Sequence, residues 1–142
     1  PEAILLTKQM RELGMKASFI SGDGVWTKEY IEISGRDAEG AFITFTPDQA
    51  KIKEAQGVLK KHKEKFGSDV GAYTVYSYVA ANMLLDTIAA TKSTDGAKIA
   101  NHIRKTKWNT ALGPIQFDKK GDVLVSPFVV WEVKDGKFVE VK

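Results

Sequence analysis

Apolar residues along this chain recur with two different periods, and each change of period marks a change of predicted structure. Residues 2–13 carry an apolar residue at every third or fourth position, which is typical of an amphipathic helix. Gly14 follows in the position where helices commonly end. The elements predicted for the first third of the chain are, in order, a helix over 2–13 whose inward face is Ala3, Leu6, Met10 and Leu13, a strand over 17–20, a helix over 27–34 that ends at Gly35, and a strand over 38–46.

Three helices are predicted for the middle of the chain, over about 48–66, 72–91 and 95–105. The first is rich in lysine, and the third follows the capping residues Ser93 and Thr94. The second is apolar or aromatic on most of its sides. A helix of that composition must be buried against something large, and no obvious sheet is within its reach in this sequence.

The last third of the chain is predicted to form strands. Residues 110–117 and 123–133 alternate apolar and polar positions, and 118–122 is predicted to be a turn between them. Asp135-Gly136 lies between valine-rich runs and is the strongest hairpin signal in the sequence.

This order of elements indicates that the chain is part of a larger α/β protein. The chain begins on a helix, whereas a crossover helix normally links two parallel strands, so the strand that should precede 2–13 is missing. The chain opens on Pro1-Glu2-Ala3, with neither an initiator methionine nor the basic segment of a signal peptide. We therefore expect a mature, trimmed or partial chain.

The composition is that of one folded domain. The 142 residues are 43% hydrophobic and carry a net charge of +3, which excludes a disordered chain. The absence of cysteine excludes disulfides and cysteine-based zinc sites. No stretch approaches the roughly 18 consecutive apolar residues that a membrane-spanning helix needs.

The basic character of the chain does not indicate a nucleic-acid partner. The densest run of lysines lies over 51–65, where the apolar residues recur at helical spacing and leave the lysines on a solvated face. Those apolar residues are Ile52, Ala55, Leu59 and Phe66. Glutamates interrupt the run, and the chain has three arginines, few for phosphate recognition.

No metal, cofactor or catalytic site is predicted. His62 and His102 have no carboxylate at metal-ligand spacing and are predicted to face solvent. Gly22-x-Gly24 follows a strand, but Thr27 stands where a dinucleotide-binding turn needs its third glycine. The 118–122 segment lacks the alternating ligands of a calcium loop. No nucleophile and base are paired in a way that predicts an enzyme.

Asp23 is the candidate binding residue that the pattern itself suggests. It lies just past the carboxyl end of a predicted strand, where ligands bind in open α/β sheets. Glycines on both sides would let a ligand approach closely, and a carboxylate there suits a ligand ammonium group. Support of a turn explains Asp23 equally well, so these residues leave both roles open.

With these residues the sequence resembles the C-terminal portion of the periplasmic leucine/isoleucine/valine-binding proteins, the type I solute-binding proteins of bacterial ABC importers. The resemblance covers essentially all 142 residues. It is carried by KQMRELG at 8–14, FISGDGVW at 19–26, AEGAFIT at 38–44, AYTVYSYVAA at 72–81 and LGPIQFDKKGD at 112–122.

The resemblance implies an α/β fold, namely part of a two-lobed type I periplasmic binding protein whose three-layer α/β/α lobes close on ligand by hinge motion. On that template, 1–46 is a segment of the second lobe, 47–109 is a helical segment of the first lobe, and 110–142 holds the return strands of the second lobe. The upstream half of the fold would be missing from this chain. Its absence would explain both the missing first strand and the uncovered apolar helix.

The resemblance also implies a binding site. Asp23 takes the place of the acidic residue that holds the ligand's α-ammonium, although many members have Glu there. Tyr73 takes the place of the aromatic residue that lines the side-chain pocket, and Gly24 and Trp26 are further candidates for ligand contact. The hydroxyl and backbone groups that hold the ligand carboxylate belong to the upstream part of the family fold, as does a further pocket aromatic.

The implied function is that of the solute-binding component of an ABC importer. It would bind an aliphatic or branched-chain amino acid in an interlobe cleft, without a cofactor, a metal or catalysis, and would deliver it to a membrane permease. The implied location is the periplasm, or the outer surface of a Gram-positive cell through a lipid anchor. The alternative is an amino-acid or amide ligand-sensing domain of a receptor or regulator. The isolated chain is expected to self-associate or to require its upstream segment, because the 72–91 helix would expose apolar surface.

Overall fold

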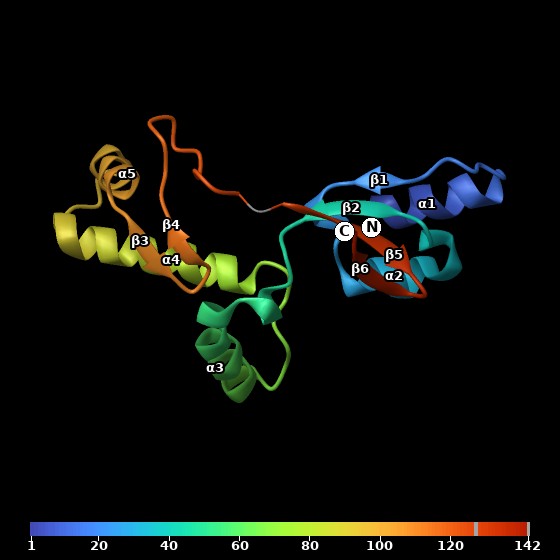
Figure 1. The fold of residues 1–142 in the computed structure, drawn as a ribbon, viewed down its shortest axis with the longest axis horizontal. Coiled ribbons are helices and arrows are strands. Elements are labelled where there is room, and N and C mark those ends of the chain that lie inside the picture. The colour runs from blue at the N-terminus through green and yellow to red at the C-terminus, as the bar shows by residue number, and fades with distance from the viewer. Residues whose placement is uncertain (127, 142) are drawn as a thin grey trace. The chain divides into compact units, whose positions relative to one another are not determined.

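The computed structural model describes residues 1–126 and 128–141, which form two compact units (Figure 1). Unit 1 comprises Pro1–Pro47 and Pro127–Lys142, and unit 2 comprises Asp48–Ser126. The first boundary, at 47/48, lies one residue from the predicted one. The second lies at 126/127, so residues 110–126, which we expected to belong with the last strands, are part of unit 2. Positions 127 and 142 of the predicted 110–142 segment lie outside the described residues.

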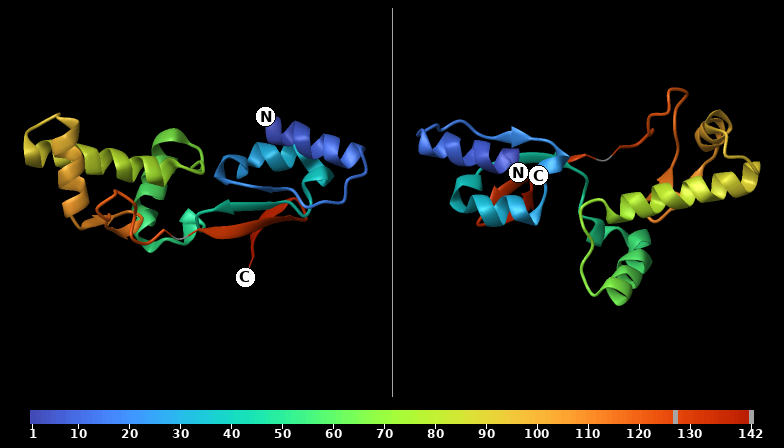
Figure 2. Two further views of the ribbon diagram at one scale, coloured as in Figure 1. Left: turned by 90° about the horizontal axis from the view of Figure 1, so that it is seen from above. Right: turned by 180° about the vertical axis from the view of Figure 1, so that it is seen from behind.

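Unit 1 is built on a four-stranded sheet in the order β1-β2-β5-β6. Its strands are β1 (Ile20–Ser21), β2 (Phe42–Phe45), β5 (Val129–Lys134) and β6 (Lys137–Glu140). β1 and β2 are parallel, whereas β2–β5 and β5–β6 are antiparallel. The helices of this unit lie on one face of the sheet (Figure 2). Ile43 and Val133 point into the core on that face, and both are fully buried.

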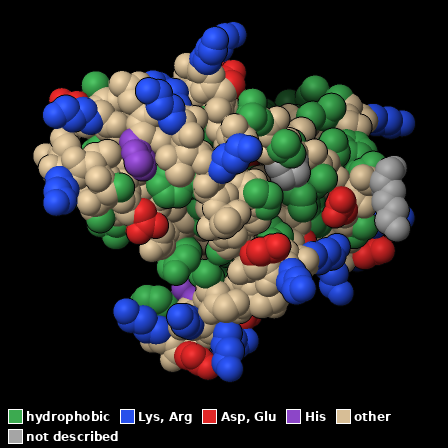
Figure 3. All heavy atoms as spheres, turned by 60° about the vertical axis from the view of Figure 1, so that its left-hand side comes forward, with side chains coloured by type: hydrophobic (Ala, Val, Ile, Leu, Met, Phe, Trp, Pro, Cys, Tyr) green, Lys and Arg blue, Asp and Glu red, His purple; other side chains and the backbone are tan. Residues whose placement is uncertain are grey.

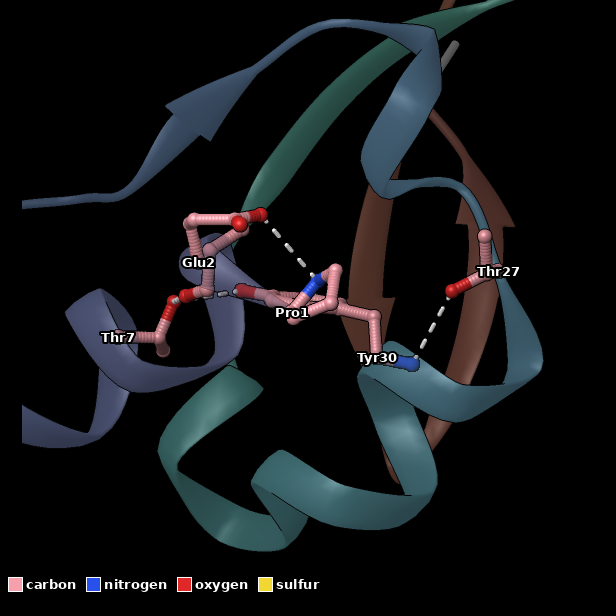
Figure 4. Close-up of polar contacts among 6 residues, drawn as sticks. Pro1, Glu2, Thr7, Thr27 and Tyr30 are labelled. Atoms are coloured by element: carbon pink, nitrogen blue, oxygen red, sulfur yellow. Dashed lines mark hydrogen bonds and ion pairs between the residues drawn. The ribbon is translucent and has the colours of Figure 1, made fainter.

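Two helices cover that face, α1 (Glu2–Glu12) and α2 (Lys28–Ser34). The Thr27 side chain caps α2 by accepting a hydrogen bond from the Tyr30 N–H at 3.2 Å, and Gly35 ends the helix with φ +56°, as predicted. The Tyr30 hydroxyl, which is buried, lies 3.1 Å from the Thr7 hydroxyl of α1 (Figure 4). This contact joins the two helices inside the core.

The buried face of α1 differs from the predicted one. Thr7 is 1% exposed, and Ala3, Ile4 and Met10 pack beside it on the core. Leu6 and Leu13, which we expected to point inward, are 50% and 79% exposed. The Thr7 hydroxyl can be buried because it lies 3.1 Å from the Tyr30 hydroxyl and donates to the Ala3 carbonyl at 2.8 Å.

The predicted Asp135-Gly136 hairpin is confirmed between β5 and β6. Both residues are in the left-handed region, with φ +51° and +68°, which a type I′ turn requires. The Glu39 carboxylate accepts hydrogen bonds from both of their N–H groups. Strand β5 begins only at Val129, so residues 123–126 of the predicted 123–133 strand are not part of it.

The chain leaves unit 1 between two polar contacts. The Trp131 indole N–H donates to the Thr46 carbonyl at 3.1 Å, just before Pro47. The Asp48 carboxylate accepts from the Ala50 N–H at 2.9 Å, just after it.

Unit 2 contains α3 (Gln56–Phe66), α4 (Thr74–Thr91), α5 (Gly96–Lys105) and the short strands β3 (Trp108–Thr110) and β4 (Gly113–Ile115). Its core is formed by Ala55, Val75, Val79 and Met83. Asp95 caps α5 by accepting from the Lys98 N–H at 2.8 Å, so the cap lies one residue after the predicted Ser93-Thr94 pair.

The predicted helix over 48–66 is wrong in its first half. Residues 48–55 form two 3₁₀ turns, Gln49–Lys51 and Lys53–Ala55, separated by Ile52 in an extended conformation. The Asp48 side chain holds the Ala50 N–H, which offers the backbone an alternative to α-helical bonding. The α-helix therefore starts only at Gln56.

Helix α4 is apolar all round, yet only one of its faces is buried within unit 2. Val75, Val79, Met83 and Thr87 recur at intervals of four residues on that face. Of the large apolar side chains elsewhere on the helix, Tyr78, Leu84 and Leu85 are 43–62% exposed, and Tyr76 and Ile88 are half-buried. The expectation that this helix exposes apolar surface in the chain by itself is therefore confirmed within unit 2.

The predicted strand over 110–117 is instead a hairpin of two short strands, β3 and β4. The Thr110 hydroxyl accepts from the Leu112 N–H and donates to the Gly113 carbonyl, which turns the chain there. Gly113 has φ +86° and permits this reversal. The Leu124 N–H bonds to the Gln116 carbonyl at 2.9 Å, which keeps 123–126 beside this hairpin in unit 2.

The lysines of α3 lie on a solvated face, as predicted. Lys60, Lys61, Lys63 and Lys65 are all exposed, and Figure 3 shows blue side chains surrounding the lower part of the molecule, where α3 lies. Phe66, expected to point inward, is 62% exposed. His62 and His102 were predicted to face solvent, but both are half-buried, because their rings pack against Phe66 and Trp108 respectively.

Candidate functional site

Asp23 lies at the carboxyl end of the parallel strand pair in unit 1. Ile20 and Ser21 of β1 pair with Phe42 and Ile43 of β2, so both strands end at the same edge of the sheet (Figure 1). Asp23 begins a 3₁₀ turn, Asp23–Val25, directly after β1. This is the position where open α/β sheets bind ligands, so the predicted location of Asp23 in the fold is confirmed.

Backbone hydrogen bonds stabilise the turn at Asp23, which is one of the two roles that the sequence suggests for this residue. Its carbonyl accepts from the Trp26 N–H at 3.0 Å, and the Gly22 carbonyl accepts from the Val25 N–H at 3.2 Å. These two bonds use main-chain atoms alone. Asp23 is itself exposed.

The two glycines beside Asp23 leave open space around it. Gly22 has φ −93°, and Gly24 is not among the glycines with positive φ, so neither conformation requires a glycine. A methyl group added at either position would meet no atom within 4 Å beyond the two residues next to it in sequence. Both glycines therefore border open space within unit 1.

Trp26 fixes the end of this loop on the sheet. Its ring packs against Phe45, Trp131 and Phe138, with centroid distances of 5.0, 5.5 and 5.3 Å. Its indole N–H is buried and has no hydrogen-bond partner among the described residues. Trp26 thus supports the loop that carries Asp23, and its contact with a ligand stays a prediction.

Tyr73 stands immediately before α4, in unit 2. Its backbone has φ −106° and ψ 2°, and its carbonyl accepts the first hydrogen bond of the helix from the Ser77 N–H at 2.9 Å. The side chain is 45% exposed. Asp23, Gly24 and Trp26 lie in unit 1, so the site that Tyr73 would complete with them is a proposal.

One hollow among the described residues is not lined by any of these candidates. It has a volume of about 400 Å³ and lies in unit 2 among α3, α4 and β3. Its charged lining residues are Glu54, Lys61 and Asp86.

Asp118 closes the predicted 118–122 turn. Its carboxylate accepts from the N–H groups of Lys120, Gly121 and Asp122 at 2.8–2.9 Å. These backbone donors stabilise the ionised form and hold the pKa of Asp118 below its usual value. The turn prediction is confirmed, and no group of three or more metal-ligating side chains occurs in the described parts of the chain.

Gln49 is the residue near the candidate site that the sequence did not single out. It is 7% exposed, and its side-chain amide binds backbone groups on either side of Tyr73. Those partners lie 23 and 26 residues further along the chain, and no local pattern signals such a contact.

Comparison with known proteins identifies the class. The periplasmic binding protein family matches residues 1–137. Leu/Ile/Val-binding protein homolog 2 of Brucella abortus (strain 2308) is 38% identical over 138 residues, which are 96% of this chain and 37% of that protein. An amino acid binding protein of Pseudomonas aeruginosa is 36% identical over 141 residues, covering 97% of this chain and 37% of that protein.

Solved structures agree with this assignment. The crystal structure of the leucine binding protein LivK from Thermotoga maritima matches with a TM-score of 0.82 and 36% identity, over 100% of this chain and 41% of that one. LivJ from Streptococcus pneumoniae, solved in complex with isoleucine, matches with a TM-score of 0.73 at 15% identity, covering 99% of this chain and 42% of that one. At that identity the second match shows the fold alone.

The fold and these matches define the class of protein, a type I periplasmic binding protein. Within that class, the chain belongs to the family of Leu/Ile/Val-binding proteins. It spans 37–41% of the length of the Brucella and Thermotoga relatives. Among the described residues, no helix is long and apolar enough to cross a membrane.

Proposed function

We propose that this chain carries part of the ligand site of a solute-binding protein for a branched-chain amino acid. The observation that carries the proposal is the position of Asp23, at the carboxyl end of parallel strands and beside open space. Membership in a family whose relatives include a leucine binding protein supports the same ligand class.

Asp23 would hold the ligand by its charge. An ionised carboxylate only accepts hydrogen bonds, and an ammonium group donates three, so the two are complementary. If water is excluded when ligand binds, removal of one partner costs on the order of 3–5 kcal/mol, because the other charge is left buried and unpaired.

Tyr73 would contact the aliphatic side chain of the ligand. Its ring leaves the backbone just before α4 and is half exposed, so it offers apolar surface with a polar hydroxyl at its tip. Gly24 would allow the ligand to approach the backbone beside Asp23. No bond is made or broken in this scheme, and it uses neither metal nor cofactor.

The remaining groups of the site would come from outside this chain. The chain spans 37% of the first Brucella relative, and the scheme assigns neither Asp23 nor Tyr73 to the ligand carboxylate. We propose that hydroxyl and backbone groups of an upstream segment hold that carboxylate in an interlobe cleft. The intact protein would work in the periplasm and pass its ligand to an ABC permease.

The test is a calorimetric titration of leucine, isoleucine and valine into the intact protein and its Asp23→Asn variant. Asn keeps the shape of Asp and removes the charge, so leucine affinity should fall at least about 100-fold. Asp135→Asn is the matched control, because it removes one charge in the same unit in a turn that suits Asn. Unchanged affinity in Asp23→Asn would exclude the ammonium role.

A further inference from the structure

Gln49 is one of the few buried polar residues among the described ones, and it lies two residues after Pro47. It is the first residue of the 3₁₀ turn Gln49–Lys51, in the segment by which the chain enters unit 2. A buried amide is costly unless its donor and acceptor are both used, so its partners define its role.

Both ends of the Gln49 amide are bonded to the same short backbone segment. Its nitrogen Nε2 donates to the Ala72 carbonyl, and its oxygen Oε1 accepts from the Val75 N–H at 3.2 Å. The Ala72 carbonyl and the Val75 N–H lie on either side of Tyr73 and Thr74. The single amide therefore brackets the backbone of Tyr73.

This contact replaces a missing helix cap. Tyr73 is the N-cap of α4 and makes no side-chain cap bond, so the first N–H groups of the helix need other partners. Gln49 satisfies the N–H of Val75, whose side chain is fully buried. The start of α4 is thus fixed by a residue 26 positions earlier.

Other bonds hold the same turn from its far side. The Gly71 N–H donates to the Thr74 hydroxyl at 3.0 Å, and the Thr74 N–H donates to the Gly71 carbonyl at 3.2 Å. Hydrogen bonds therefore fix the backbone on both sides of Tyr73. Its side chain nevertheless remains half exposed.

We propose that Gln49 is a positioning residue for Tyr73, and that it thereby sets how tightly the aliphatic side chain of the ligand is packed. This inference rests on the proposed function, in which Tyr73 contacts that side chain. Gln49 touches no ligand in this scheme. It fixes the backbone at Tyr73 and thereby the direction in which the Tyr73 side chain extends. A glutamine suits the place because Ala72 needs a donor and Val75 an acceptor, which glutamate and methionine cannot both supply.

The test is a double-mutant cycle on leucine binding in the intact protein, with Gln49→Met, Tyr73→Ala and the double variant. Methionine keeps the approximate volume of the side chain and removes both hydrogen bonds. Gln49→Met should weaken leucine binding about tenfold and should have no further effect once Tyr73 is Ala. A residue that only stabilised the fold would leave leucine affinity unchanged in a variant that folds, and an effect on binding independent of Tyr73 would be additive.

Gln56→Met is the matched control. Gln56 also bonds two backbone carbonyls of unit 2, those of Ala50 and Ile52, but none at Tyr73. Its substitution should leave leucine affinity unchanged. Far-UV circular dichroism and thermal unfolding verify that each variant folds. If Gln49→Met does not fold, Gln49→Glu replaces it in the cycle, and the same outcomes apply.

The outcomes separate the two proposals. Additive effects of Gln49 and Tyr73, or unchanged affinity in the Gln49 variant, would overturn the positioning role and leave the proposed function standing. Unchanged affinity in Tyr73→Ala would overturn the ligand contact itself, and the positioning role with it. Loss of leucine binding in Gln56→Met equal to that in Gln49→Met would also overturn the inference.

Discussion

The carboxylate of Glu39 accepts a hydrogen bond from the backbone N–H of Gly136 at 2.7 Å, across 97 positions of sequence. Its second oxygen accepts from the N–H of Asp135 at 3.0 Å. Both donors belong to the turn that joins β5 to β6, so one side chain holds the reversal of the C-terminal hairpin. The hairpin is thereby tied to the segment that precedes β2.

We expect Glu39→Gln to destabilise unit 1 by about 1 kcal/mol, because an amide offers one acceptor oxygen where the turn has two donors. Urea unfolding followed by circular dichroism measures the change. Glu12→Gln makes the same substitution in the last turn of α1, where loss of a negative charge is not unfavourable, and should cost nothing. Equal midpoints for the two variants would contradict the role of Glu39.

The hydroxyl pair of Thr7 and Tyr30 predicts a second stability change. Tyr30→Phe removes the 3.1 Å contact, while Thr7 still donates to the Ala3 carbonyl, so we expect a loss of about 1 kcal/mol rather than more. Tyr78→Phe is the control, because Tyr78 is 47% exposed. If Tyr30→Phe unfolds at the same urea concentration as the parent protein, the contact contributes nothing.

The same tyrosine predicts a dependence of stability on alkaline pH. Burial raises the pKa of Tyr30 above its ordinary value of 10.0, so the folded state disfavours its ionisation. A folded pKa above the unfolded one gives stability that is complete below pH 10 and is lost as the pH rises through the folded pKa. The free energy of unfolding should therefore decrease more between pH 8 and pH 11 in the parent protein than in Tyr30→Phe. An equal fall in both would exclude Tyr30 as the cause.

The open space at Gly24 predicts a variant that separates folding from binding. Gly24→Ala should leave stability within about 0.5 kcal/mol, because the added methyl meets no atom within 4 Å beyond the two residues next to it in sequence. Leucine binding should weaken about tenfold if ligand occupies that space. Gly96→Ala, which is equally open in unit 2, should change neither quantity. Native affinity in Gly24→Ala would show that no ligand comes close to this residue.

The uncovered side of α4 predicts self-association of this chain alone. Leu85 is 62% exposed, and we expect Leu85→Gln to raise the concentration at which the 142-residue chain associates, with its helix content unchanged. Size-exclusion chromatography with light scattering measures this. Ile33→Gln, at a 56% exposed position of α2, should have a smaller effect. A parent chain that stays monomeric at every concentration would contradict the prediction.

Local signals in the sequence sufficed where the structure is held by local contacts. Thr27 and Gly35 mark the two ends of α2, and Asp135-Gly136 forms the turn of the hairpin. Each of these effects depends on contacts within four residues along the chain. The position of Asp23 could be predicted because it depends only on where a strand ends.

Prediction from sequence failed where side chains capture the backbone or where partners are remote. Asp48 and Thr110 divert the chain into turns inside segments whose apolar spacing indicated a single helix and a single strand. The inward face of α1 depends on Tyr30, 23 residues away, which no helical period reveals. The partners of Gln49 are remote in the same way, 23 and 26 residues further along the chain.

The two polar contacts that flank Pro47 limit how the first connection between the units can move. The Thr46 carbonyl is held by Trp131, and Asp48 is held by its own capping bond. Because the proline ring fixes φ of Pro47 and peptide bonds are planar, the soft torsions left between these contacts are essentially ψ of Pro47 and φ of Asp48. Between these contacts this connection is therefore short, with about two rotatable bonds.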